Sequence, residues 1–203
     1  MTYRSTVDAD GVYIHYDLNG NYVDSEGVAT TSGTQYGGSY MPSFVSTLLP
    51  GQTSNSALYF DDSASGVYVG TTAQAQACFG TALDDNGSMS IECWYKSDST
   101  LSGGMRTAGV ENLIRHDGTL WWLRISSKKT SMLINTTVNT NYAQDGSTTL
   151  ANDTLYHLVG TYDSTDKKIR IYVNGVLDGT SAALTGTLTT GTNANATYIG
   201  SPG

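Results

Sequence analysis

The stretch that decides the fold is Tyr156 to Gly179, which reads YHLVGTYDSTDKKIRIYVNGVLDG. In its first part, Tyr156–Asp163, the residues fall alternately on two faces of an extended chain, with the period of two that a strand imposes. The polar run Asp163–Asp166 is typical of a turn, because short Asp and Ser side chains can bond the local backbone. A second alternating segment, Lys168–Val173, leads to Asn174-Gly175, the strongest short signal for a hairpin. The stretch therefore predicts strand, turn, strand, tight turn and returning strand.

The composition of the whole chain agrees with this all-β prediction. Glycine is abundant (23 residues), proline is scarce (3), and tyrosine (14) outnumbers the other aromatic residues. A chain of 203 residues is long enough for one β-sandwich with a core. We expect a single domain over residues 1–203, with an irregular segment at about 19–56, where polar residues show no period.

Further strands are predicted wherever short alternating or apolar runs lie between turn signals. These runs are Val12–Leu18, Ala57–Phe60, Val67–Val69, Met89–Lys96, Leu113–His116, Leu120–Ser126, Ser131–Val138 and Tyr198–Gly200. The two cysteines, Cys78 and Cys93, belong to no metal-binding or CxxC spacing. We expect two half-buried thiols, with a disulfide between them as the alternative.

The charge of the chain restricts its partners. A net charge of −8 at pH 7 argues against nucleic acid and anionic membranes, because no basic patch is present to release counterions. No apolar run approaches the length of a membrane span, and the N-terminal sequence MTYRSTVDADG lacks a basic-then-apolar signal segment. We expect no membrane insertion, and a chain that is made in the cytoplasm or cut from a longer precursor.

Three groups of motifs, in the same order along the chain, resemble the core of laminin G-like domains, which are concanavalin A-like jelly rolls related to pentraxins. They are Ala57–Asp62 with Gly66–Val69, Ser88–Ser97, and Tyr156–Asp163 with Ile171–Leu177. The resemblance covers roughly residues 57 to 200. It implies an all-β fold, a two-sheet antiparallel β-sandwich of the concanavalin A-like or laminin G-like kind, and it does not fix the ligand.

The residues before these motifs resemble the lead-in of bacteriophage structural proteins that carry this fold. The matching residues are Tyr13–Leu18, Asp24–Gly27 and Leu49–Gly51. This resemblance implies a virion-surface protein assembled in the host cytoplasm, as a capsid decoration or a tail-associated component. Its partners would then be other virion proteins or further copies of itself.

Catalysis is not expected, although concanavalin A-like sandwiches include glucanases. Those enzymes need a paired acid and nucleophile on one strand, as in an E-x-D-x-E run, so that two carboxylates flank the glycosidic bond. The chain contains only three glutamates, Glu26, Glu92 and Glu111, and no such run. His15, His116 and His157 are isolated, and each is expected to be a strand residue with a hydrogen-bond partner.

Calcium is the one candidate cofactor, and no other is expected. Asp61 and Asp62 match the turn at which laminin G-like and pentraxin domains place acidic residues, so the resemblance implies a candidate calcium site there. The preferred alternative is that both residues simply form the turn, because no second acidic loop with fixed spacing can be identified.

Aromatic residues beside polar ones are the candidates for a sugar-binding surface. Trp94 shares a strand face with Glu92 and Lys96, and Trp122 shares one with Arg124. A flat ring beside polar groups can stack on a sugar and bond its hydroxyls, which makes these two tryptophans and Arg124 the ligand-binding candidates. The alternative, which we prefer, is that loops cover both tryptophans.

A docking surface is expected in the segment from Tyr22 to Tyr40. Tyr22, Tyr36 and Tyr40 lie among Gly and Ser with no strand period to bury them, so they are docking candidates. The chain is therefore predicted to be a non-catalytic, virion-surface structural or binding module. The alternative is a carbohydrate-binding, lectin-like module of a particle or of a larger secreted, extracellular protein.

The C-terminal end carries one more expectation. In the resembling family a closing strand follows the Tyr-Ile-Gly strand and pairs with the first strand, whereas this chain ends at Gly203 soon after Tyr198–Gly200. We expect Val12–Leu18 to lack that partner within residues 1–203. Either the native polypeptide continues, or a neighbouring chain adds the missing strand.

Overall fold

The computed structural model describes residues 34–36, 43–46, 56–60, 66–68, 87–99, 110–116, 121–189 and 197–201. These ranges contain strands, turns and extended segments, and no helix in them is suited to crossing a membrane. The strands are β1 (Thr34–Tyr36), β2 (Ser43–Ser46), β3 (Ser56–Tyr59), β4 (Gly66–Tyr68), β5 (Met89–Tyr95), β6 (Val110–His116), β7 (Trp121–Ser126), β8 (Lys129–Ile134), β9 (Tyr142–Asp145), β10 (Tyr156–Asp163), β11 (Lys168–Val173), β12 (Val176–Thr180) and β13 (Thr197–Ser201).

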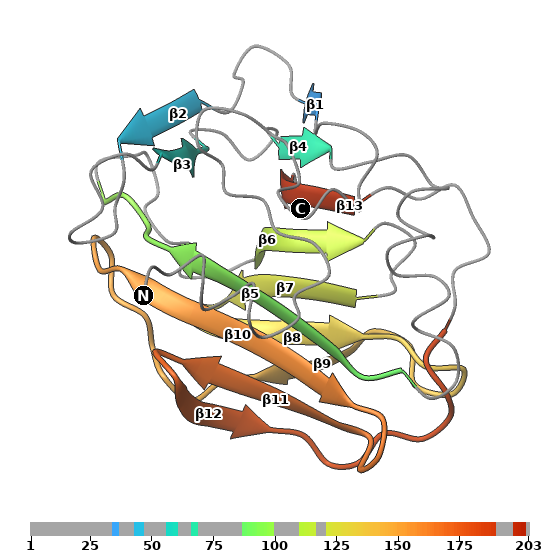
Figure 1. Cartoon of the computed structure of the whole chain (residues 1–203). Helices are drawn as coiled ribbons and strands as arrows, with labels where there is room; N and C mark the ends of the chain where they lie inside the picture. Colours follow the sequence, from blue (N-terminus) through green and yellow to red (C-terminus); the bar gives the residue numbers. More distant parts are fainter. Residues whose placement is uncertain are drawn as a thin grey trace, which may run out of the picture.

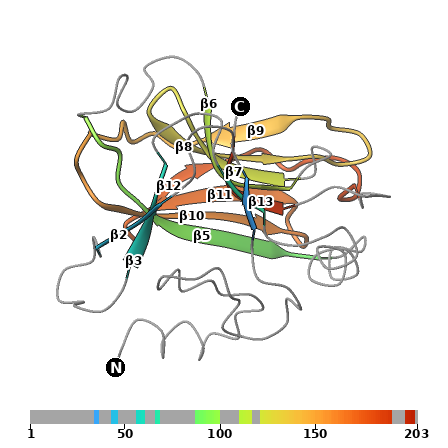
Figure 2. The same ribbon diagram turned by 90° about the horizontal axis from the view of Figure 1, so that it is seen from above.

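The strands form two main antiparallel sheets that lie against each other. The large sheet has the order β1-β4-β13-β6-β7-β8-β9, and the small sheet has the order β12-β11-β10-β5. Strands β2 and β3 pair separately as a third, two-stranded sheet. Figures 1 and 2 show the small sheet as a layer over the part of the large sheet that β6–β9 form. The predicted two-sheet antiparallel β-sandwich is thus confirmed.

Side chains from the facing surfaces of the two sheets make the core. The alternation predicted for β10 is confirmed, because Leu158, Gly160 and Tyr162 are buried while the residues between them are partly exposed. The same alternation occurs in β11 and in β7. The main cluster of buried core residues is Ile91, Trp121, Leu123, Met132, Ile134, Tyr162, Ile169, Ile171, Leu184 and Leu188.

The turns predicted around β11 are also confirmed. Asn174 and Gly175 have φ angles of 51° and 78°, the two positive values that a type I′ hairpin turn needs. At the other end of β11, the backbone N–H of Thr165 donates to Asp163 Oδ1 at 2.8 Å. The N–H of Lys168 donates to Asp166 Oδ1 at 3.1 Å, so both aspartates stabilise the turn as expected.

Several elements differ from the sequence-based expectation. Residues 19–56, expected to be irregular, contain β1 and β2, which are too short for a period of two to be visible. The sequence also gave no sign of β9, and the strand expected at 131–138 begins at Lys129 and ends at Ile134. Val12–Leu18 and Cys78 lie outside the described residues.

The turn between β7 and β8 was not predicted either. Ser127 and Lys128 form it, with φ angles of 49° and 64°. Glycine or asparagine normally marks such a position, because other side chains rarely adopt positive φ. Here the pairing of β7 with β8 along their whole length holds both residues in that conformation.

The two sheets approach each other closely at Gly160, in the middle of β10. A Cβ atom at this position would lie 2.8 Å from Met132 Sδ and 3.2 Å from Leu123 Cδ1, and both of these atoms belong to the large sheet. Gly160 is therefore needed for space, since no larger side chain fits between these sheets without a shift.

Replacing Gly160 by alanine should lower the free energy of unfolding by about 1–3 kcal/mol, the usual cost of overpacking a core. The neighbouring variant Thr161→Ala is the matched control, because Thr161 points away from the core and is only half-buried. Urea denaturation of both variants measures the difference. Equal stability of Gly160→Ala and the parent protein would contradict the close packing described here.

Asp178 in β12 connects the edge of the small sheet to the loop that follows β9. Its Oδ1 accepts hydrogen bonds from Ser147 Oγ at 2.8 Å, from Thr148 Oγ1 at 2.6 Å and from Thr148 N at 3.0 Å. The N–H of Ser147 donates to the Asp178 backbone oxygen at 3.0 Å. Burial raises the pKa of this carboxyl, but hydrogen bonds from Thr148 and Ser147 outweigh burial and hold the pKa below its usual value.

Because the folded state lowers the pKa of Asp178, its contribution to stability is present above the unfolded value of about 4 and is lost as the pH falls through the folded value. Asp178→Asn should destabilise the protein at pH 7 by about 0.5–1.5 kcal/mol, because these hydrogen bonds are exposed to solvent. The difference from the parent should shrink as the pH falls below about 4. Urea denaturation over this pH range measures it, and a difference that does not change with pH would refute the role of the charge.

Candidate functional site

The outer face of the small sheet brings together aromatic, hydroxyl and charged side chains. These residues alternate with the core residues of β5, β10 and β11, so they point away from the large sheet. The cross-strand pairs are Trp94 with His157, Glu92 with Val159, Val159 with Tyr172, Ser90 with Thr161, and Thr161 with Arg170. We call this surface, defined by Ser90, Glu92, Trp94, His157, Val159, Thr161, Arg170 and Tyr172, the small-sheet outer face.

Trp94 is the most unusual residue of this face, because 42% of this large apolar residue is exposed. Its ring stacks on the ring of His157, with 4.9 Å between centroids and 27° between planes. The Nε2 atom of His157 lies 3.1 Å from Glu92 Oε2, and the His157 backbone N–H donates to Asn174 Oδ1 at 2.9 Å. The indole is thus held from one side by a histidine that two other residues position.

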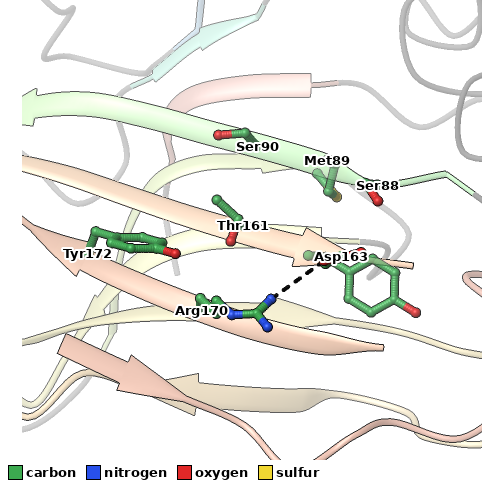
Figure 3. Close-up of a pocket in the computed structure, with 8 residues that line it drawn as sticks. Ser88, Met89, Ser90, Thr161, Asp163, Arg170 and Tyr172 are labelled. Carbon is green, nitrogen blue, oxygen red and sulfur yellow. Dashed lines mark ion pairs between the residues drawn. The ribbon is translucent and has the colours of Figure 1, made fainter. Parts of the chain in front are cut away.

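An open pocket of about 580 Å³ lies on the same face. Figure 3 shows Ser90, Thr161 and Tyr172 along this surface, with an ion pair between Arg170 and Asp163 at one end. The pocket is lined by Ser88, Met89, Ser90, Thr161, Tyr162, Asp163, Arg170 and Tyr172. It therefore offers hydroxyl groups, an aromatic ring and an ion pair within one shallow surface.

The ion pairs of Arg170 fix the charges at that end. Its guanidinium contacts Asp166 in a short ion pair, and Nη1 lies 3.8 Å from Asp163 Oδ2. The hydrogen bond from Arg170 is the largest cause that lowers the pKa of Asp166. Asp166 therefore stays ionised at neutral pH.

The outer face of the large sheet carries a different group of aromatic and cationic residues. The guanidinium of Arg124 lies 5.8 Å from the centroid of the Trp122 ring, and that of Arg115 lies 5.3 Å from the Tyr198 ring. Trp122 Nε1 donates to the His116 backbone oxygen at 3.3 Å. We call this surface, defined by Tyr68, Tyr198, Arg115, Trp122 and Arg124, the large-sheet outer face.

The structure thus separates the predicted ligand-binding residues. Trp122 and Arg124 lie together on the large sheet, whereas Trp94 lies on the small sheet and points to the opposite side of the sandwich. The three residues cannot contact one small ligand. The prediction that loops cover both tryptophans is wrong for Trp94, because 42% of this residue is exposed to solvent. Trp122 is half-buried.

The other predicted sites fall mostly outside the described residues. Asp61 and Asp62, the candidate calcium ligands, and the docking candidates Tyr22 and Tyr40 all lie there. Tyr36 ends β1 and pairs with Gly66 of β4, so its backbone is a strand and not irregular as expected, while its role in docking stays a prediction. Within the described part of the chain, no group of three or more His, Cys, Asp or Glu residues is arranged to hold a metal ion.

Two of the three glutamates are described, and they lie on different sheets. Glu92 faces outward from β5, next to His157. Glu111 of β6 accepts a hydrogen bond from Tyr95 OH at 2.9 Å. Burial, and after it the charge of Glu111, raises the pKa of Tyr95, so the phenol stays protonated. The two glutamates have separate partners and share no cleft in this part of the chain.

Sequence reasoning singled out neither His157 nor Tyr172 as a ligand-binding residue. The signal was present, because Arg170 and Tyr172 alternate with the apolar residues of β11 and must share its outer face. What the sequence did not show is that β5 pairs with β10, which brings Trp94 next to His157.

Cys93 lies under this face, on the core side of β5. It is a free thiol, in agreement with the preferred expectation, and Cys78, its partner in the alternative, lies outside the described residues. Burial, followed by the neighbouring charge of Glu92, raises the pKa of the Cys93 thiol to about 12.

Cys93 should therefore resist thiol reagents in the folded protein. In a Cys78→Ser variant, which leaves Cys93 as the one cysteine, the thiol should react with a disulfide reagent at pH 8 many-fold more slowly in native buffer than in denaturant. The release of the coloured leaving group measures the rate. Fast reaction of the native protein would show that the core side of β5 is open to solvent.

Comparisons with known proteins agree with this architecture. A family model described as the concanavalin A-like lectin/glucanases superfamily matches residues 69–202, about two thirds of the chain. No curated protein matches the chain significantly. Among solved structures, domain 4 of AbnA, a GH43 extracellular arabinanase from Geobacillus stearothermophilus in complex with arabinotriose, is similar with a TM-score of 0.60. It is 17% identical, over 92% of this chain and 81% of that one.

Two toxin domains are also similar in structure. The binding domain of botulinum neurotoxin serotype C1 has a TM-score of 0.58 and 12% identity, over 93% of this chain and 42% of that one. The binding domain of Paraclostridial Mosquitocidal Protein 1 has a TM-score of 0.54 and 10% identity, over 84% of this chain and 40% of that one. At these identities the likeness shows the fold alone.

Proposed function

The chain belongs to the concanavalin A-like lectin/glucanase superfamily, and from this premise we propose that it is a non-catalytic, carbohydrate-binding module. Its site is the small-sheet outer face. The superfamily includes both lectins and glucanases, so the choice between binding and hydrolysis depends on the residues of this chain.

The exposed ring of Trp94 carries the proposal. A sugar presents C–H groups on one side of its ring, and a flat aromatic surface covers them at little conformational cost. Trp94 stacks on His157, which holds the indole in a fixed orientation, while 42% of the residue is exposed. Tyr172, on the strand beyond β10, adds a second aromatic ring on the same face.

Polar groups close to these rings supply the hydrogen bonds that a saccharide needs. Ser90 and Thr161 are cross-strand partners, and Thr161 is in turn the partner of Arg170. Hydroxyl and guanidinium groups in this order can bond successive sugar hydroxyls while solvent reaches the rest of the ligand. The shape of the site, an open depression and not a closed cavity, suits one face of an oligosaccharide chain.

The carboxylates of this face support binding over hydrolysis. A glycosidase needs one carboxyl group with a raised pKa as general acid, set opposite a second carboxylate. Asp166 has a lowered pKa because Arg170 bonds it, and Glu92 is engaged by His157. Neither carboxylate therefore resembles a glycosidase acid.

The comparisons support the same class of function. Domain 4 of the arabinanase was solved with arabinotriose bound, and both toxin domains are described as binding domains. The virion surface remains our proposal for where such a module works, and it rests on the lead-in residues Tyr13–Leu18, Asp24–Gly27 and Leu49–Gly51. An extracellular protein is the alternative setting.

A glycan array that includes neutral arabino-, gluco- and galacto-oligosaccharides tests the proposal. The parent protein should bind at least one neutral saccharide, and Trp94→Ala should weaken that binding by about tenfold, the upper end for one aromatic contact. Val138→Ala is the matched control, because Val138 is 64% exposed in the loop after β8, away from this face.

The protein could instead bind no saccharide and still stay attached to purified virus particles. That result would favour a purely structural role. Binding that Trp94→Ala leaves unchanged would place the sugar elsewhere.

A further inference from the structure

We propose that the large-sheet outer face is a second binding site, and that its ligand is an acidic saccharide that carries carboxylate groups. This site lies on the opposite side of the sandwich from Trp94 and does not depend on the proposed function of the small-sheet outer face.

The large-sheet outer face is continuous across four strands. Tyr68 in β4 is the cross-strand partner of Tyr198 in β13, and Tyr198 is the partner of Arg115 in β6. Arg115 is in turn the partner of Trp122 in β7. Directly opposite residues share one face of a sheet, so four neighbouring strands place these side chains in a single row. The row has the length of a short oligosaccharide.

Aromatic rings orient the two guanidinium groups of this face. Arg115 lies over Tyr198, whose ring packs edge-on against Tyr68 at 5.7 Å, and Arg124 lies over Trp122. A guanidinium stacked in this way keeps its planar fork of N–H donors in a fixed direction. That fork matches the two oxygens of a carboxylate.

Arg124 is half-buried and makes no ion pair within the part of the chain that the structure describes. Buried or half-buried cations are normally paired with an anion. Arg124 Nε donates to Ser131 Oγ at 3.3 Å, but its terminal nitrogens have no ion pair or hydrogen bond within the described residues. Burial lowers the pKa of this guanidinium, and the charge of Asp145, which lies on the same face beyond Ser131, opposes that effect without an ion pair to Arg124. An anionic group on the ligand would complete the site.

The chemistry of the surface selects the class of anion. The net charge of −8 disfavours a long polyanion such as nucleic acid, because the rest of the surface would repel it. An acidic oligosaccharide fits better, since its ring can cover Trp122 while a carboxylate meets Arg124. The same surface should discriminate against the neutral form of that saccharide.

Calorimetric titration with trigalacturonate, sialyllactose and a hyaluronan oligosaccharide, each compared with its methyl ester, tests the inference. The parent protein should bind at least one free acid tenfold or more tightly than the ester, because charge-assisted hydrogen bonds are lost in the ester. Added salt should weaken this binding. Arg124→Gln should remove the preference, and Arg124→Lys should restore it only in part.

Two further variants separate this site from the first. Lys96→Gln removes one positive charge near the small sheet and should leave the preference for the acid intact. Trp94→Ala should weaken the binding of neutral saccharides by about tenfold and leave that of the acid unchanged. Equal affinity for acid and ester, no affinity for any of the three acids, or an acid preference that survives Arg124→Gln would overturn the inference.

Discussion

The close contact between Gly160 and Met132 is the constraint on which the rest of the structure depends. Gly160 is the central residue of β10, and the absence of a side chain there lets the small sheet approach β7 and β8 of the large sheet. This approach fixes which face of each strand is inside. Once Leu158 and Tyr162 are buried, His157, Val159 and Thr161 must point outward.

The two outer faces that result have different chemistry. The small-sheet outer face has an exposed indole, hydroxyl groups and an arginine whose charge two aspartates balance. The large-sheet outer face has a row of aromatic rings with two arginines stacked on them, in a chain that is acidic as a whole. One sandwich can therefore present an exposed indole on one side and arginines stacked on aromatic rings on the other, with the core between them.

Much of the fold could be predicted from the sequence, and less of the site. The alternation in β10 and β11 and the Asn174-Gly175 turn are local patterns, and a strand or hairpin follows from them directly. The separation of Trp94 from Trp122 depends on strand order, which no local pattern contains. The exposure of Trp94 likewise depends on what packs above β5, and the Ser127-Lys128 turn is held by pairing and not by its own residue types.

The most direct test of the central claim, that a neutral saccharide binds the small-sheet outer face, is an NMR titration of the tryptophan side chains. The chain has three tryptophans and therefore three indole N–H signals, which Trp→Phe variants assign. Trp121 lies in the core, while Trp94 and Trp122 lie on opposite faces. A saturating neutral saccharide should shift the Trp94 signal and leave those of Trp121 and Trp122 in place. A shift of Trp122 with none at Trp94 would contradict the account.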